Sequence, residues 1–184
     1  SSLAVATEDE KNLGCTVVDM GGGTCDLISF AQGCVIHTGS VPVGGINFTH
    51  DLALGLRTTQ ISAENLKRKY GCALVDMITG EESIEVEAMG GRKARSLQRR
   101  ELCTILEART EETLQLIKTE LSHNELMKRL GSGLILTGGT SVLPGLMEMG
   151  EFIFDVPVRR GAPDHVGGLT DIVRCASFSA AIGL

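Results

Sequence analysis

The chain has 184 residues, of which 42% are hydrophobic and 22% are charged, and its formal net charge at pH 7 is −6. A chain of this length forms one domain or two small ones and can bury enough surface to fold without disulfides. The negative charge argues against a nucleic-acid-binding surface, because binding a phosphate backbone places positive charge on the contacting face. No apolar run approaches the roughly 20 residues of a membrane span, so we expect a chain that does not cross a membrane by itself.

Six cysteines occur without Cys-x-x-Cys spacing and without a histidine at metal-ligand spacing, at positions 15, 25, 34, 72, 103 and 175. This pattern gives little support to a zinc site or a redox pair. We expect most of them to be small buried residues in a reducing cytosol, where thiols stay unpaired. No signal peptide is recognisable at the first residues.

The first 13 residues are polar and charged, and we expect them to be a connecting segment. Three strands are predicted next, over 15–20, 24–31 and 35–42. Short turns join them, so the sheet is predicted to begin as an antiparallel meander.

The turn between the first two strands consists of three successive glycines, Gly21, Gly22 and Gly23. A turn without side chains can point several backbone N–H groups into one concavity, which suits a phosphate group. Asp19 at the end of the first strand can hold a hydrated magnesium ion, and Thr24 adds a hydroxyl donor. A tight hairpin that binds nothing is the alternative.

Two helices are predicted after the meander. A glycine pair at 44–45 opens an amphipathic run, and a second helix extends from Ser62, which suits the N-cap, to a stop at Gly71. Within this second helix, Glu64 and Lys67 are three residues apart and share a face. In the absence of a ligand, they would form an ordinary solvated ion pair.

The pattern changes between residues 76 and 132, where we expect a smaller inserted lobe. Alternating apolar and charged residues predict a half-exposed strand over 83–87. A long amphipathic helix is predicted over 99–121, with an apolar stripe on one side and mixed charges on the other. A short amphipathic segment over 125–130 ends the lobe.

The last part of the chain is predicted to contain a buried strand, a helix, a second strand and a final helix, over 133–137, 143–151, 156–160 and 177–182. The sequence Gly138-Gly139-Thr140 interrupts the first strand before the first helix. Missing side chains there allow a flat base or a phosphate to approach the backbone beside a helix N-terminus. A close crossing of strand and helix is the alternative.

Several strings resemble a known family. The run from Asp19 to Asp26 resembles the second phosphate loop of the superfamily of actin, sugar kinases and DnaK-type chaperones. Four further runs resemble the bacterial division protein family FtsA: Val41–Ala53, Ala63–Gly71, Arg95–Arg99 and Leu136–Thr140. The resemblance extends from about Thr7 to the last residue. It covers the second half of such a protein, because the first phosphate loop would precede residue 1.

The resemblance implies an α/β fold, the second half of an actin-like (ribonuclease H-like) ATPase with a mixed sheet flanked by helices and an inserted smaller lobe. It divides the chain into a connecting segment, an ATPase subdomain in two pieces and a lobe, over 1–13, 14–75 with 133–184, and 76–132.

The resemblance also implies an ATP site with magnesium. Asp19 would be the catalytic residue and would hold magnesium through water. The other residues expected to contact the nucleotide are those of the glycine turn, the second helix and the later glycine break: Gly21, Gly22, Gly23, Thr24, Glu64, Lys67, Gly138, Gly139 and Thr140.

Members of this family polymerise and link the tubulin-like division protein FtsZ to the inner membrane face through an amphipathic C-terminal helix, which is not within this sequence. The resemblance implies that the lobe binds the C-terminal tail of FtsZ at four positions, Arg100, Leu106, Arg109 and Thr113. Guanidinium groups suit a tail carboxylate. Pairing of both arginines with glutamates of their own helix is the alternative. Other division proteins are further expected partners.

Two other functions within the superfamily are open. A sugar or acetate kinase would place a substrate-binding acid against ATP, although no substrate motif is recognisable in this sequence. A DnaK-type chaperone ATPase would carry a peptide-binding β-domain. For the division protein we expect at most weak ATP hydrolysis by the intact protein and none by this chain alone.

Overall fold

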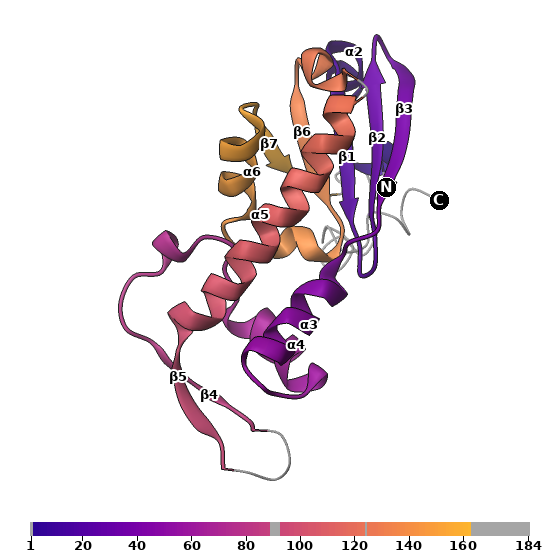
Figure 1. Cartoon of the computed structure of the whole chain (residues 1–184). Helices are drawn as coiled ribbons and strands as arrows, with labels where there is room; N and C mark the ends of the chain where they lie inside the picture. The colour runs from indigo at the N-terminus through magenta and orange to yellow at the C-terminus, as the bar shows by residue number, and fades with distance from the viewer. Residues whose placement is uncertain (1, 89–92, 124, 163–184) are drawn as a thin grey trace, which may run out of the picture.

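The computed structural model describes residues 2–88, 93–123 and 125–162. Its centre is a five-stranded sheet in the order β3-β2-β1-β6-β7 (Figure 1). The strands are β1 (Cys15–Met20), β2 (Cys25–Ala31), β3 (Cys34–Val41), β6 (Gly133–Thr137) and β7 (Val158–Arg160). The strands β1, β2 and β3 pair antiparallel, whereas β1 with β6 and β6 with β7 pair parallel. The predicted mixed sheet is therefore confirmed.

The central strands are the most apolar ones. All five residues of β6 are buried, as are five of the six residues of β1. Both strands are central in the sheet: β1 lies between β2 and β6, and β6 lies between β1 and β7. By contrast, β3 is the edge strand and is mostly exposed. The parallel pairing of β1 with β6 places the ends of these two strands side by side, and both predicted glycine breaks lie there.

Two short helices, α1 (Ser2–Val5) and α2 (Glu8–Leu13), lie within the segment predicted to be a connection. Thr7 caps α2 in a capping box with Glu10, so each satisfies a backbone N–H group of the other. Arg159 on β7 forms an ion pair with Glu10, with 2.6 Å between Nε and Oε1. The segment is thus attached to the edge of the sheet.

Helices α3 (Gly45–Gly55) and α4 (Gln60–Tyr70) follow the meander. The second of them begins two residues before the predicted start. Its N-cap is Thr59, whose hydroxyl accepts a hydrogen bond from the backbone N–H of Ser62, so Ser62 is a first-turn residue and not the cap. Gly71 ends the helix, as predicted.

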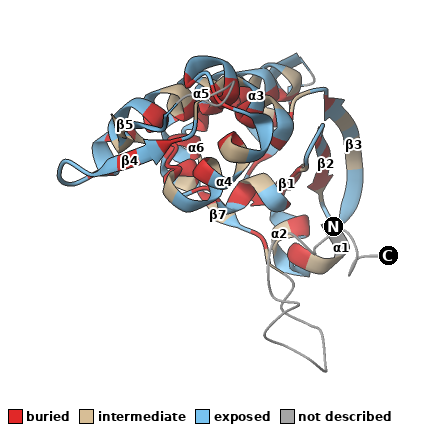
Figure 2. Cartoon of the chain, turned by 90° about the horizontal axis from the view of Figure 1, so that it is seen from below, coloured by how far each residue is buried: buried red, intermediate tan, exposed pale blue. Residues whose placement is uncertain are grey.

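Helix α5 (Arg99–His123) runs along the body and packs against α3 and α6 (Leu146–Phe154). A separate two-stranded antiparallel sheet of β4 (Ser83–Val86) and β5 (Arg95–Gln98) lies at the far end of α5 (Figure 1). Figure 2 shows buried residues gathered on the inner sides of these helices. One hydrophobic cluster contains residues of β4, α5 and the main sheet. The division into an ATPase subdomain and a lobe stays a prediction.

Three 3₁₀ turns complete the described elements: η1 (Val75–Met77), η3 (Leu126–Arg129) and η4 (Gly139–Val142), the last of which precedes α6. The helix predicted over 143–151 therefore begins and ends three residues later. The final helix predicted over 177–182 lies outside the described residues. No helix in the described part of the chain is both long enough and apolar enough to span a membrane.

Candidate functional site

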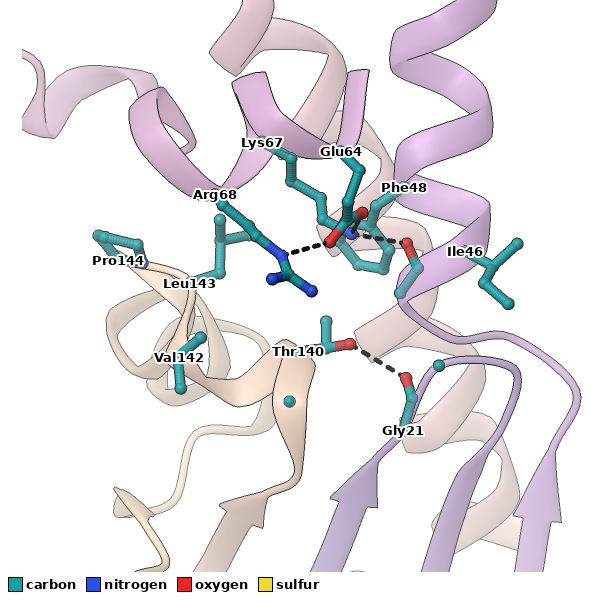
Figure 3. Close-up of a pocket in the computed structure, with 13 residues that line it drawn as sticks. Gly21, Ile46, Phe48, Glu64, Lys67, Arg68, Thr140, Val142, Leu143 and Pro144 are labelled. Carbon is teal, nitrogen blue, oxygen red and sulfur yellow. Dashed lines mark hydrogen bonds and ion pairs between the residues drawn. The ribbon is translucent and has the colours of Figure 1, made fainter. Parts of the chain in front are cut away.

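A cavity of about 740 Å³ opens where three segments distant in sequence meet (Figure 3). They are the glycine turn after β1, the first turn of α3 with the inner face of α4, and the turn after β6. A volume of this size lies within the range of about 300 to 1,000 Å³ that is common for small-molecule sites. The cavity is lined by Gly21, Gly22, Gly45, Ile46, Phe48, Glu64, Lys67, Arg68, Gly139, Thr140, Val142, Leu143 and Pro144.

Gly138 brings the two glycine breaks together. Its φ angle is +86°, a region that favours glycine, and a Cβ atom there would lie 2.4 Å from Asp19 Oδ1 and 2.6 Å from the carbonyl oxygen of Met20. No side chain can occupy this position unless the backbone moves. The turn after β6 thus lies close against the end of β1, next to the cavity lining, whereas the crossing of strand and helix that was the alternative stays a prediction.

Backbone hydrogen bonds join the glycine turn to α3. The carbonyl oxygen of Gly21 accepts from the backbone N–H of Gly45 at 2.9 Å and from Thr140 Oγ1 at 3.1 Å. The carbonyl oxygen of Gly22 accepts from the backbone N–H of Ile46 at 2.8 Å. These bonds need no side chain on the turn, so the cavity floor is made of main chain.

Helix α4 contributes the charges of the site. Glu64 Oε2 lies 2.6 Å from Lys67 Nζ, and Glu64 Oε1 lies 2.8 Å from Arg68 Nε. Burial by itself would raise the pKa of Glu64, but hydrogen bonds from Lys67, Thr49 and Arg68 outweigh burial and lower that pKa to about 2. The predicted ion pair exists, and it faces the cavity as a carboxylate that stays ionised at neutral pH.

Arg68 and the five apolar residues of the cavity lining, which form its apolar wall, were not among the predicted residues. In Figure 3, the Arg68 guanidinium points into the cavity between Glu64 and Thr140. The signal that could have identified it is its position four residues after Glu64, where an ion pair across one helical turn is favourable. The apolar residues Ile46, Phe48, Val142, Leu143 and Pro144 gave no local signal, because their faces depend on how the segments pack.

Six of the predicted nucleotide-binding residues line the cavity: Gly21, Gly22, Glu64, Lys67, Gly139 and Thr140. The other four do not line it. Gly138 supports the wall from behind, Gly23 is exposed at the tip, and the Thr24 hydroxyl donates to Asp26 at 3.3 Å. Asp19 is partly buried at the end of β1.

Within the described residues, no group of three or more His, Cys, Asp or Glu side chains could hold a metal ion. Asp19 does not line the cavity, and its expected contact with a hydrated magnesium ion stays a prediction.

The four residues predicted to bind a partner do not form one surface. Leu106 and Thr113 lie seven residues apart on the inward face of α5 and are fully buried, so the expectation that they contact a partner is wrong. Arg109 Nη2 donates to Asp51 Oδ1 at 3.0 Å and its Nη1 lies 2.7 Å from Glu112. Arg109 therefore pairs both with a glutamate of its own helix, as the alternative expected, and with an aspartate of α3. Arg100 is exposed, 3.6 Å from Asp76.

Comparison with known proteins agrees with this architecture. Residues 16–183 match the family model described as "Cell division protein FtsA". The cell division protein FtsA of Neisseria meningitidis is 44% identical over 185 residues, which cover 100% of this chain and 45% of that protein. The FtsA proteins of Pseudomonas aeruginosa and Escherichia coli are 42% and 39% identical, with 100% of this chain and 44% and 46% of theirs covered. The chain spans about half the length of these relatives.

Solved structures share the fold. The crystal structure of MreB5 of Spiroplasma citri bound to ADP has a TM-score of 0.78 at 21% identity, covering 99% of this chain and 55% of that one. The MamK double helical filament has a TM-score of 0.63 at 19% identity, covering 94% of this chain and 55% of that one. At such identities the likeness establishes the actin-like fold alone. With the family match over nearly its whole length, the chain belongs to the FtsA family of cell division proteins.

Proposed function

We propose that this chain is the second half of an actin-like division protein and that its cavity holds the base, ribose and part of the phosphates of ATP. The observation that carries the proposal is the meeting of three segments, each with different chemistry, around one nucleotide-sized cavity. The relation to MreB5, whose crystal structure is described as bound to ADP, supports the same ligand class.

Each wall suits one part of the nucleotide. The Glu64 carboxylate can accept hydrogen bonds from the vicinal ribose hydroxyls. The glycine turn carries no side chain at Gly21 and Gly22, so a phosphate can approach the backbone N–H group of Gly22. A flat base fits between Arg68 and the bare backbone of Gly139, with apolar neighbours from the turn after β6.

Bound magnesium ATP would supply an activated phosphoanhydride bond and the positive charge that neutralises the phosphates. In this chain, Asp19 is the carboxylate that would hold the hydrated ion and orient water near it. We expect weak hydrolysis at most by the full-length protein.

Titration calorimetry of the full-length gene product with magnesium ATP tests the proposal. Glu64→Ala should weaken ATP binding at least tenfold, because the ribose loses its acceptor and Lys67 its partner. Glu111→Ala, an exposed glutamate of α5, is the matched control and should bind like the unaltered protein. Equal affinities for the three proteins would contradict the nucleotide assignment. ADP formation that depends on glucose or acetate would instead identify a kinase.

The magnesium assignment has a separate test. In the full-length gene product, Asp19→Ala should abolish the gain in ATP affinity that magnesium causes. The affinity measured in EDTA should change less. Magnesium dependence that survives in this variant would show that another group holds the ion.

We further propose that the full-length protein assembles into filaments at the cytoplasmic face of the membrane and binds the C-terminal tail of FtsZ. The MamK double helical filament, a relative in fold, supports self-association. Arg100 and the partly exposed Arg109 remain candidate contacts for an acidic tail, since a guanidinium can bind a carboxylate in a bidentate way.

Fluorescence titration with a labelled FtsZ tail peptide tests the partner. Arg100→Gln should weaken binding of the peptide at least tenfold without a change in melting temperature, because this side chain is exposed and its ion-pair partner Asp76 is exposed as well. Arg57→Gln, which removes an exposed arginine in the turn between α3 and α4, is the control. An unchanged affinity of Arg100→Gln would remove it from the interface.

A further inference from the structure

Thr49 forms a junction between the two helices of the cavity. It lies one turn into α3 and is 6% exposed, yet it does not line the cavity. Its hydroxyl accepts a hydrogen bond from Lys67 Nζ at 2.8 Å and lies within hydrogen-bonding distance of the Glu64 carboxylate and of the carbonyl oxygen of Gly45. A hydroxyl can donate only one hydrogen, which goes to one of these two oxygens at a time.

The ammonium group of Lys67 is fully occupied by this junction. It has three hydrogens, and its three acceptors are Glu64 Oε2 at 2.6 Å, Thr49 Oγ1 at 2.8 Å and the carbonyl oxygen of Gly45 at 2.9 Å. No donor is left for a ligand. Lys67 therefore acts on the site through its stem and through the carboxylate that it holds.

The two oxygens of Glu64 consequently have different tasks. Oε2 is held from behind by Lys67 and Thr49, whereas Oε1 lies beside Arg68, whose guanidinium points into the cavity. A carboxylate oxygen can accept two hydrogen bonds, so Oε1 has capacity for a ligand hydroxyl. The orientation of this oxygen depends on the bonds made to the other one.

We propose that Thr49 is a positioning residue that orients the Glu64 carboxylate toward the ribose hydroxyls of the nucleotide. The inference rests on the proposed ATP site and extends it to a residue that does not touch the ligand. Removing the hydroxyl leaves Lys67 short of one acceptor and lets the carboxylate rotate. The energetic effect falls on nucleotides that have ribose hydroxyls and spares those that lack them.

Titration of the full-length gene product with ATP and with 2′,3′-dideoxy-ATP tests the assignment. In Thr49→Val, which keeps the shape of the side chain, the affinity for ATP should fall at least fivefold while the affinity for the dideoxy nucleotide changes less than twofold. Thr49→Ser keeps the hydroxyl, so the ratio of its affinities for ATP and for the dideoxy nucleotide should equal that of the unaltered protein.

The matched control is Thr110→Val on α5. Thr110 is also a buried helical threonine whose hydroxyl donates to the carbonyl oxygen four residues earlier, and it lies outside the cavity lining. This variant should leave both affinities unchanged. If Thr49→Val fails to fold, Thr49→Ala takes its place in the same titrations, because it adds no new branch.

Coupling to Glu64 provides a second measurement. If Thr49 acts through that carboxylate, Thr49→Val should cause no further loss of ATP affinity in a Glu64→Gln background. Equal losses for both nucleotides, or additive losses in the double variant, would overturn the inference and leave the ATP site standing. Absence of ATP binding by the unaltered protein would overturn the proposed function and this inference with it.

Discussion

The cavity and the α3–α5 contact are stabilised in different ways. Main-chain hydrogen bonds build the cavity floor, and the neighbouring glycines Gly44 and Gly138 have no room for a Cβ atom. Side chains build the α3–α5 contact, where an ion pair between Arg109 and Asp51 lies beside apolar packing. The glycine positions beside the floor should therefore be sensitive to the smallest added side chain, whereas the helix contact should respond to a change of charge.

The largest effect is expected at Gly138. Gly138→Ala should lower the free energy of unfolding by about 3 kcal/mol, because it combines a positive φ with overpacking. The new Cβ would lie 2.4 Å from Asp19 Oδ1. Chemical denaturation of the full-length protein measures the loss.

Two other glycines separate the causes of that loss. Gly80 has a φ of +90° and open space around it, so Gly80→Ala reports the backbone strain alone, about 1 kcal/mol. Gly23→Ala has neither a positive φ nor a neighbour within 4 Å and should be nearly neutral. Similar losses for all three variants would show that the cavity floor is not specially sensitive.

The next effect is expected in the α3–α5 contact. Arg109→Glu should lower the free energy of unfolding by about 2 kcal/mol, because it places three carboxylates together in a partly buried position. This differs from the expectation that the residue serves a partner only, in which case the melting temperature would not change.

Charge reversal at Arg100 on the same helix is the control. That side chain is 55% exposed, and Arg100→Glu should change the free energy of unfolding by less than about 0.5 kcal/mol. Thermal melts of both variants measure the difference, and equal melting temperatures would remove the structural role of the Arg109 pair.

A third comparison uses pH. Hydrogen bonds from Arg159 lower the pKa of Glu10 to about 2, from an ordinary value of 4.5. Because the folded pKa is the lower one, ionised Glu10 stabilises the fold above pH 4.5, and this stabilisation is lost as the pH falls toward 2. Glu10→Gln should therefore destabilise the protein by about 1 to 2 kcal/mol at pH 6 and much less at pH 3.

Glu8→Gln is the control for this titration. Its side chain is 80% exposed and pairs with Lys11 within one helix, so the change should be small at either pH. Urea denaturation at the two pH values provides the data. A loss in Glu10→Gln that does not depend on pH would refute the role of its charge.

The smallest effect concerns the start of α4. Thr59→Ala should lower the free energy of unfolding by about 1 kcal/mol, because it removes the acceptor of a first-turn N–H group. Ser62→Ala should change the free energy of unfolding by only a few tenths of the loss expected for Thr59→Ala. A larger loss at Ser62 would restore it as the cap and would contradict the helix boundary described above.

Much of the cavity could be predicted because its signals are local. The glycine runs at 21–23 and 138–139 indicate backbone without side chains, and the three-residue spacing of Glu64 and Lys67 puts both on one face of a helix. The spacing of Arg68 from Glu64 was a usable signal of the same kind, whereas Thr49 and the apolar wall could not be selected, since their roles depend on which residues of another segment lie opposite them.

The α5 contacts show the opposite case. An apolar stripe predicts that the helix has a buried face, and Leu106 and Thr113, which were expected to contact a partner, both lie on that face. The partner of Arg109 is 58 residues away in sequence, on α3, and no pattern within the helix indicates it.

By itself, the sequence determined the strands of the sheet, the glycine breaks at their ends and the family to which the chain belongs, because backbone conformation and hydrophobic period are local properties. The tertiary structure alone decided which polar groups meet. Parallel pairing of β1 with β6 brings Gly138 against Asp19, and the packing of α3 on α4 places Thr49 between Glu64 and Lys67. Such contacts join residues whose separation in the chain carries no information about their distance in space.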